Sequence, residues 1–417
     1  MEKTNWSVGC ALIVILAPLA EIILNLTDTQ SYISYRVWIM FLFIPAVFGL
    51  LIAIKDFSFK KVYKPPFIML LIFGAWSIFC AAISDTPFMC FFGFVPMSDC
   101  VSVYLSYFAM ILIGIMMSES KKSVIILSKV YVILASIFAI FSLIDNGITY
   151  QLFANEATNC FHYQGPFYNT NHCGYYLTIA LILCGYMIEY LESKREKIVY
   201  AICFVLLTNM LILNNTMGSY LAVLLTFFFA VIWSFINREN KVKPASIFLA
   251  FIVLSAISLI YTSNVIDNFT SMFSDVSTVI DSSADIEEVA SVGSARGGLW
   301  KLALQAIKIS PIVGFGPQGI GFSAHNMYLQ IGMYTGIPGL AMYLAFLVLG
   351  VIRLIKLRKE ISPITRACAF AVVGYLISGF FGLTVFYTAP YFYIVLGVCL
   401  GGCIIERPQG DDALRSF

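Results

Sequence analysis

Residues 218–236 read GSYLAVLLTFFFAVIWSFI, a run without a charged side chain. Such a run approaches the ~20 apolar residues that a helix needs to cross a bilayer. Similar runs recur along the 417-residue chain, which is 60% hydrophobic and only 12% charged. Soluble domains carry roughly 25% charged residues. The sequence therefore predicts an all-α polytopic membrane protein, with residues 1–417 forming a single integral membrane domain.

Apolar runs bounded by charged or turn residues predict about twelve transmembrane helices. We expect these helices over residues 8–26, 37–54, 66–84, 101–118, 123–143, 172–190, 198–213, 218–236, 245–262, 337–355, 367–384 and 389–405. The longest polar segment, residues 263–336, is then a loop inserted between spans nine and ten.

The basic residues predict how the chain is oriented. Alternate loops are rich in lysine and arginine, as at Lys60, Lys121, Lys194, Lys241 and Arg358. The opposite loops contain just Arg36, Arg296, Lys301 and Lys308. Because cytoplasmic loops carry an excess of Lys and Arg, we expect both termini in the cytoplasm and the 263–336 loop outside.

The cysteines leave two disulfides open. Cys90 and Cys100, or Cys160 and Cys173, fall in expected outer loops and could pair, although spacing alone does not decide it. No CxxC or Cys/His pattern typical of a metal site is present. We therefore expect no metal and no cofactor.

Within the long loop, Leu299–Ile309 has helical periodicity, and Lys301, Gln305 and Lys308 share one face. This pattern predicts a short amphipathic helix at the membrane surface, with Trp300 at headgroup depth. Pro311 ends the helix. Arg296 lies just before its first turn, so the guanidinium and the helix N-terminal amides could face one anion together.

A glycine-rich segment follows, Gly314-Phe315-Gly316-Pro317-Gln318-Gly319. Although it is formally a GxGxxG, a dinucleotide site needs a preceding strand and a helix directly after it. This segment instead follows a helix and contains a proline. We interpret it as a tight turn whose backbone amides, at Gly314 and Gly316, come close to a ligand.

His325-Asn326 opens another helical stretch, Met327–Tyr334, which ends at Thr335-Gly336-Ile337-Pro338-Gly339. His325 and Tyr328 are i, i+3 neighbours, and Asn326 and Gln330 are i, i+4 neighbours. That spacing places an imidazole and two amides at the outer mouth of the tenth span.

Two more polar segments are expected on the same side. Residues 162–174, HYQGPFYNTNHCG, precede the sixth span and include Asn169 and Asn171; Asn171 could also simply be the N-cap of that helix. Residues 214–219, NNTMGS, precede the eighth span. The three segments could converge on one outer cavity.

Taken together, these residues resemble the O-antigen ligase and polymerase family of bacterial membrane proteins. The resemblance rests on four motifs in order and on an upstream GxFxNxNxxGxYL element at Gly165–Leu177. The four are Arg296-Gly297-Gly298-Leu299-Trp300, Pro311–Gly316, His325-Asn326-Met327-Tyr328-Leu329-Gln330 and Gly336-Ile337-Pro338-Gly339.

The resemblance implies a metal-independent glycosyltransferase with a GT-C-like fold in the bacterial cytoplasmic (inner) membrane. Such enzymes move a glycan from an undecaprenyl-diphosphate carrier, on the outer face, to an acceptor hydroxyl. The acceptor is a lipid-linked core for ligases and another repeat unit for polymerases; nucleic acid plays no part.

By the same resemblance, Arg296 would bind the diphosphate and His325 would act at the reacting centre. A guanidinium suits a diphosphate leaving group, and a neutral imidazole suits proton removal near pH 7. We expect the substrate-binding residues to be Asn169, Asn171, Lys301, Lys308, Gly314, Gly316, Asn326, Tyr328 and Gln330.

The chain departs from the family pattern at one position. The family often has a second arginine at the outer start of the span at 218–236, where this chain has Thr216-Met217-Gly218-Ser219-Tyr220. Either Lys301 or Lys308 clamps the donor instead, or the subgroup differs from classical ligases. This favours a polymerase or another enzyme of polysaccharide assembly.

The main alternative is a multi-spanning transporter or flippase of polysaccharide or lipid-linked precursor. Against it, the sequence has no repeated halves, no matched pair of interrupted helices and few charges within spans.

Overall fold

A computed structural model describes residues 2–26, 31–56, 64–93, 99–147, 165–167, 169–238, 241–259, 270–271 and 296–401. Each predicted span falls on one α-helix of this structure, although several of these helices are shorter than a full span. These helices are α1 (Glu2–Leu26), α2 (Ser31–Asp56), α3 (Lys64–Ala82), α5 (Val101–Met117), α6 (Lys121–Gly147), α7 (Thr170–Tyr190), α8 (Lys194–Asn214), α9 (Met217–Ile236), α10 (Val242–Leu259), α14 (Met327–Lys356), α15 (Pro363–Gly379) and α16 (Ala389–Gly401).

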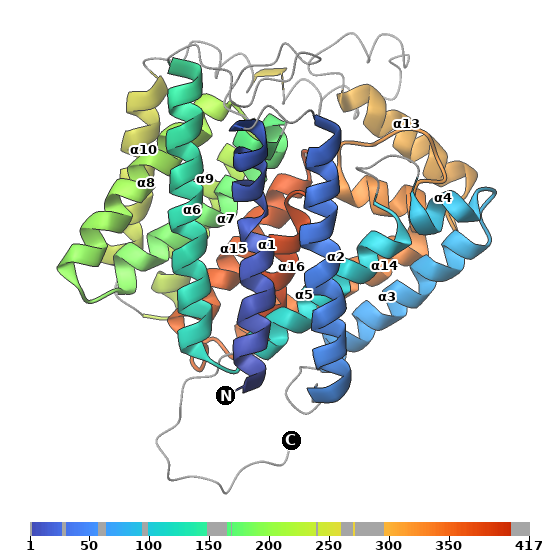
Figure 1. Cartoon of the computed structure of the whole chain (residues 1–417), viewed down its shortest axis with the longest axis horizontal. Helices are drawn as coiled ribbons and strands as arrows, with labels where there is room; N and C mark the ends of the chain where they lie inside the picture. The colour runs from blue at the N-terminus through green and yellow to red at the C-terminus, as the bar shows by residue number, and fades with distance from the viewer. Residues whose placement is uncertain are drawn as a thin grey trace, which may run out of the picture.

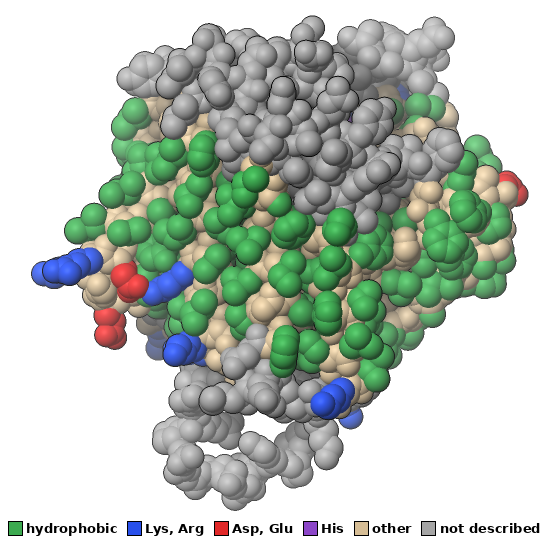
Figure 2. Space-filling view, in the orientation of Figure 1, with side chains coloured by type: hydrophobic (Ala, Val, Ile, Leu, Met, Phe, Trp, Pro, Cys, Tyr) green, Lys and Arg blue, Asp and Glu red, His purple; other side chains and the backbone are tan. Residues whose placement is uncertain are grey.

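Length and composition confirm a polytopic membrane protein. Among the described residues, 7 helices are long and apolar enough to cross a membrane, and further apolar helices of 10–17 residues accompany them. Figure 2 shows a broad hydrophobic surface across the visible face, with most of the visible Lys and Arg side chains along its left and lower margins. A bilayer requires such a surface because it offers no hydrogen-bond partners to polar groups.

Three short elements complete the described fold: α4 (Pro87–Phe92), the 3-10 helix η2 (Gly165–Phe167) and α13 (Arg296–Ile309). Figure 1 shows α13 at the upper right of the bundle, away from the start of α1, with α4 below it at the right-hand side. Of the 263–336 loop, residues 263–269 and 272–295 lie outside the described residues.

Small residues allow the central helices to approach closely. A Cβ added at Gly114 on α5 would lie 2.1 Å from the carbonyl oxygen of Ile394 on α16. Close backbone approach at glycines is typical of helix pairs in membranes. Beside this contact, Tyr375 of α15 stacks on Phe392 of α16 with ring centroids 4.4 Å apart. The same bundle centre therefore holds α5, α15 and α16 together.

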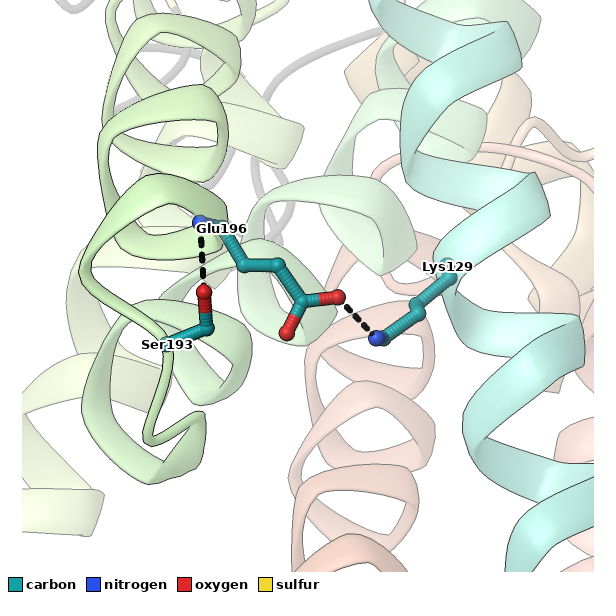
Figure 3. Close-up of polar contacts among 3 residues, drawn as sticks. All are labelled: Lys129, Ser193 and Glu196. Atoms are coloured by element: carbon teal, nitrogen blue, oxygen red, sulfur yellow. Dashed lines mark hydrogen bonds and ion pairs between the residues drawn. The ribbon is translucent and has the colours of Figure 1, made fainter.

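An ion pair joins α6 and α8 (Figure 3). Lys129 of α6 donates to Glu196 in the first turn of α8, with 2.5 Å between Nζ and Oε1. The Ser193 hydroxyl accepts a hydrogen bond from the Glu196 amide and so caps α8. Lys129 is therefore a structural residue of the α6–α8 contact.

The cysteines correct one expectation. Cys90 and Cys100 are buried free thiols, so they do not form the disulfide that was left open. Cys173 is likewise a buried free thiol, and Cys160 lies outside the described residues.

Candidate functional site

The helix that carries the candidate arginine is longer than predicted. α13 begins at Arg296 itself, and the small residues Gly297, Gly298, Ala303 and Ala306 are buried. Because these residues have little or no side chain, α13 can pack directly on α14. The start of the helix, and with it Arg296, is thereby held against the protein.

Trp300 corrects the expectation of a headgroup anchor. Its side chain is only 4% exposed and packs edge-on against Phe380, with ring centroids 5.5 Å apart. An amphipathic pattern suits either a membrane surface or a protein surface, and here the apolar face of α13 lies against protein. Along the same helix, Lys301 is half-buried and Lys308 is exposed. A helical rise of ~1.5 Å per residue places Lys308 about 18 Å from Arg296 along the axis.

The glycine turn supports the fold instead of a ligand. The amide of Gly314 donates to the Ser310 carbonyl at 3.2 Å, and that of Gly316 to the Tyr334 carbonyl at 3.0 Å. Both glycines have positive φ, at 64° and 78°. A Cβ at Gly314 would lie 2.4 Å from the Met333 carbonyl oxygen. The expectation that these two amides face a ligand is therefore wrong, since both are already paired within the protein.

This turn packs on the predicted break in α14. Gly336 has non-helical angles, φ 68° and ψ −176°, and divides α14 into two segments. The Ile337 amide donates to the Pro311 carbonyl at 2.8 Å across that break. The kink separates the first part of α14, which carries the HNxYLQ residues, from the long membrane-spanning part.

The HNxYLQ residues have distinct structural roles. The Asn326 side chain caps α14 by accepting from the amides of Tyr328 and Leu329 at 3.0 and 3.1 Å. The Tyr328 hydroxyl donates to the Leu376 carbonyl of α15 at 2.9 Å. Gln330 Oε1 accepts from the Ala324 amide at 2.8 Å. These three side chains fix the loop that presents His325.

His325 occupies a strained position at the end of that loop. Its φ is 47°, in the left-handed region that non-glycine residues seldom adopt. The His325 amide donates to the Ser323 hydroxyl at 3.3 Å. Such conformations cost about 1–3 kcal/mol and cluster at functional sites. The strain and the caps around it hold the imidazole in one place.

The start of α7 supplies the partner of Arg296. Asn169, not Asn171, is the N-cap, because its side chain accepts from the Asn171 amide at 2.8 Å. The Asn171 side chain is then available to accept from Arg296 Nη2 at 3.3 Å. Residues 125 positions apart in the sequence are thus joined at one site.

Sequence reasoning did not select two other residues that the structure places here. His172 Nδ1 is buried without a hydrogen-bond partner, and the charges of His172 and His325 interact. The buried Tyr175 hydroxyl also has no partner and interacts with the Arg296 charge. His172 directly follows Asn171, and Tyr175 lies four residues after Asn171 on the same helix, and this spacing is the signal that would have found them.

The third polar segment also reaches this site. A Cβ at Gly174 of α7 would lie 2.6 Å from the Ser219 hydroxyl and 3.0 Å from Cβ of Thr216. The N-cap and first residues of α9, positions 216–219, therefore pack against the start of α7. They bring hydroxyl groups and no cation.

Electrostatics favour a neutral imidazole at His325. Burial, and secondarily the nearby positive charge of Arg296, lower the pKa of His325 below its ordinary value of 6.5. A neutral imidazole can accept a proton near pH 7. The site thus pairs a fixed cation with a base and adds a second imidazole and a phenol that have unpaired polar atoms.

A sequence model of the O-antigen ligase family matches residues 202–344. The chain is similar to this family over that segment, which is about a third of its length. The matched segment includes Arg296 and His325, whereas Asn171 and His172 are contributed by α7, outside it. Enzymes of this family are of the ligase and polymerase type and act in surface polysaccharide assembly. No curated protein matches the chain.

Proposed function

We propose that this protein transfers a glycan from an undecaprenyl-diphosphate carrier to an acceptor hydroxyl. The observation that carries the proposal is the convergence of Arg296, His325 and α7 at one end of the bundle. A diphosphate requires a cation and an attacking hydroxyl requires a base. Both lie together at the rim of a membrane-spanning bundle, where a polyprenyl chain can remain in lipid.

In the proposed reaction, the acceptor hydroxyl oxygen forms a bond to the anomeric carbon of the donor sugar. The bond from that carbon to the phosphate oxygen breaks, and the carrier diphosphate leaves with the electron pair. His325 accepts the hydroxyl proton. Arg296 stabilises the charge that grows on the leaving diphosphate, and Asn171 orients the guanidinium through the hydrogen bond at 3.3 Å.

The proposal includes a location and an orientation. The protein lies in a bacterial cytoplasmic membrane with both termini in the cytoplasm, and the 263–336 loop lies on the outer face. The basic residues at the helix ends opposite α13 support this orientation. Whether the acceptor is a lipid-linked core or a repeat unit distinguishes a ligase from a polymerase, and the absence of the second arginine favours a polymerase.

The decisive experiment uses the full-length protein in nanodiscs, an undecaprenyl-diphosphate-linked glycan and an acceptor, with EDTA present. Wild type should yield longer or transferred glycan. Arg296→Ala should lose on the order of 10²–10³-fold in rate, as for removal of one transition-state donor. His325→Asn should lose on the order of 10²–10⁴-fold, as for loss of a general base. Asparagine is chosen because it tolerates positive φ.

Arg358→Ala is the matched control, because Arg358 is an exposed arginine at the other end of α14. It should retain wild-type activity. Unchanged rates in both site variants would refute the proposed roles. Loss of activity in EDTA would refute metal independence, and glycan uptake into vesicles without bond formation would indicate a transporter.

A further inference from the structure

A second site lies beside the first but has a different character. A cavity of about 340 Å³ is bounded by α3, α5 and α14. This volume lies within the range of small-molecule pockets. Its walls are mainly aliphatic and aromatic, with Leu70, Phe73 and Phe108 among them. Arg296 and His325 do not line it.

Buried polar side chains line the same cavity, and one of them, Ser77, is paired with the Phe73 carbonyl. Asp99 is 8% exposed, Gln330 is 5% exposed and Thr384 is 7% exposed. Gln330 Nε2 and Thr384 Oγ1 are buried with no hydrogen-bond partner in the protein. Buried donors and acceptors are normally paired, so unpaired atoms need an explanation. Both atoms belong to side chains of the cavity wall, and a ligand there would satisfy them.

The carboxyl group of Asp99 is the third member of this set. Its Oδ1 accepts from the Tyr107 hydroxyl at 3.2 Å. Burial raises the pKa of Asp99 to about 8, against the smaller opposing effect of that hydrogen bond. At neutral pH the carboxyl is therefore largely protonated and can both donate and accept a hydrogen bond.

The cavity also reaches the outer surface of the bundle. Its exposed lining residues include three large apolar side chains: Leu71 at 42%, Ile78 at 40% and Leu105 at 49%. The first two lie on α3 and the third on α5. Because these side chains lie on the hydrophobic surface of the bundle, an apolar chain can enter between α3 and α5 directly from the bilayer.

The side chains that line the cavity favour an uncharged head group on such a lipid. None of the described residues that line the cavity is basic. A phosphate would therefore be buried without a cation, which is costly. Hydroxyl and amide groups instead match the unpaired Gln330 and Thr384 atoms and the protonated carboxyl.

Gln330 places this polar end next to the reacting site. Its carbonyl oxygen holds the Ala324 amide, directly before His325, while its amide nitrogen remains unpaired. A head group bonded to that nitrogen would therefore be separated from the loop that presents the imidazole by the Gln330 side chain alone.

We propose that this cavity binds the lipid chain of an uncharged, hydroxyl-bearing glycolipid acceptor, with its polar end hydrogen-bonded to Asp99, Gln330 and Thr384. The role of this lipid as acceptor rests on the proposed function. Its binding does not, because the cavity and its unpaired atoms are independent of catalysis.

The test measures binding by photo-crosslinking to the full-length protein in phosphatidylcholine nanodiscs. The probe is an alkyl glucoside with a dodecyl chain and a terminal diazirine, and labelled peptides are mapped by mass spectrometry. A dodecyl phosphate with the same diazirine is the anionic comparison. The glucoside should label α3 and α5 at the cavity, and the phosphate should label these peptides at least about fivefold less.

Two pairs of variants locate the site. Gly74 lines the cavity with open space beside it, so Gly74→Phe fills the cavity; Gly9 on α1 has similar open space, so Gly9→Phe is its control. Asp99→Ala removes the buried carboxyl, and Asp85→Ala removes an exposed one. Gly74→Phe and Asp99→Ala should each reduce cavity labelling about fivefold or more, whereas both controls retain it.

The outcomes separate the two proposals. Labelling that survives Gly74→Phe, or equal labelling by the phosphate probe, overturns the cavity assignment. Arg296→Ala should keep wild-type glucoside labelling even where transfer is lost. Should Arg296→Ala and His325→Asn both remain fully active while Gly74→Phe still abolishes labelling, the proposed reaction fails and the lipid site stands.

Discussion

The kink at Gly336 provides a sharp test of how the site is built. Gly336 has φ 68° and ψ −176°, a region that only glycine occupies readily. A Cβ there would lie 2.2 Å from the carbonyl oxygen of Ile312 and 2.4 Å from its carbonyl carbon. These are backbone atoms, so no side chain can turn aside to relieve the contact. Gly336→Ala therefore requires the 311–316 turn and α14 to separate.

The cost has two parts. Forcing a residue with a Cβ into this region costs about 1–3 kcal/mol, and overpacking costs about 1–3 kcal/mol more. We expect Gly336→Ala to lower the free energy of unfolding by roughly 4 kcal/mol. Gly350 on the same helix has no atom within 4 Å of an added Cβ and ordinary helical backbone. Gly350→Ala should stabilise by about 0.5–1 kcal/mol, because alanine favours helix.

The buried free cysteines, such as Cys173 and Cys184, supply the assay. A thiol-reactive dye becomes fluorescent as heat exposes them. The midpoint should fall by on the order of 5–10 °C in Gly336→Ala and stay or rise slightly in Gly350→Ala. Equal midpoints for wild type and Gly336→Ala would show that the turn does not hold the kink. A large loss in Gly350→Ala would show that any glycine change in α14 is harmful.

Four further predictions concern individual residues. Diethyl pyrocarbonate acylates neutral imidazole, so the rate of its reaction with His325, followed by mass spectrometry, should fall to half at a pH below 6.5. Arg296→Gln should move that midpoint to higher pH, because a repelling charge is removed. An unmoved midpoint would contradict the electrostatic coupling of Arg296 and His325. The lowered pKa of His325 also means that its contribution to stability is complete above 6.5 and declines as pH falls, which pH-dependent melting can check. Asn326→Ala should cost about 0.5–2 kcal/mol through loss of the α14 cap, and Asn326→Asp should recover most of it in the same melting assay. Glu196→Gln should cost less than about 1 kcal/mol, because both partners of its ion pair are partly exposed; a larger loss would mean that the α6–α8 contact depends on that charge.

Much of the fold could be predicted from the sequence because the bilayer imposes strong requirements on composition. A span must be apolar for about 20 residues, so runs such as 218–236 identify helices whatever their neighbours do. The break at Gly336 was also predictable, since a glycine followed by Ile-Pro-Gly seldom continues a regular helix. The family motifs point to Arg296 and His325, and the roles of these two residues stay predictions.

What could not be predicted depends on which surfaces meet. The amphipathic pattern of α13 does not tell membrane from protein, so Trp300 was placed at headgroup depth although Phe380 covers it. Glycine turns suit ligands and close packing equally, and at Gly314 the neighbour is backbone. Either Asn169 or Asn171 suited the cap of α7. Asp99 could not be identified from the sequence, because a single acidic residue in a loop predicts no binding site until the cavity around it is known.

The two sites differ in charge: the site at Arg296 is cationic, whereas the cavity has no basic residue among its described lining. Arg296 supplies a cation beside His325, whose pKa is lowered first by burial and then by that charge, and a cation suits the phosphate-bearing donor that we propose. Across Gln330, the cavity offers a largely protonated carboxyl, a hydroxyl and an unpaired amide, with no basic residue among its described lining. A lipid diphosphate would be disfavoured in the cavity, because its charge would be buried without a cation. An uncharged glycolipid would be disfavoured beside Arg296, because it would make no charged contact with the guanidinium. Because Gln330 hydrogen-bonds to the His325 loop and also lines the cavity, an acceptor that satisfies its free amide would hold that loop in place. Charge sorting of this kind would let one enzyme take two lipids from the same bilayer without exchanging their roles.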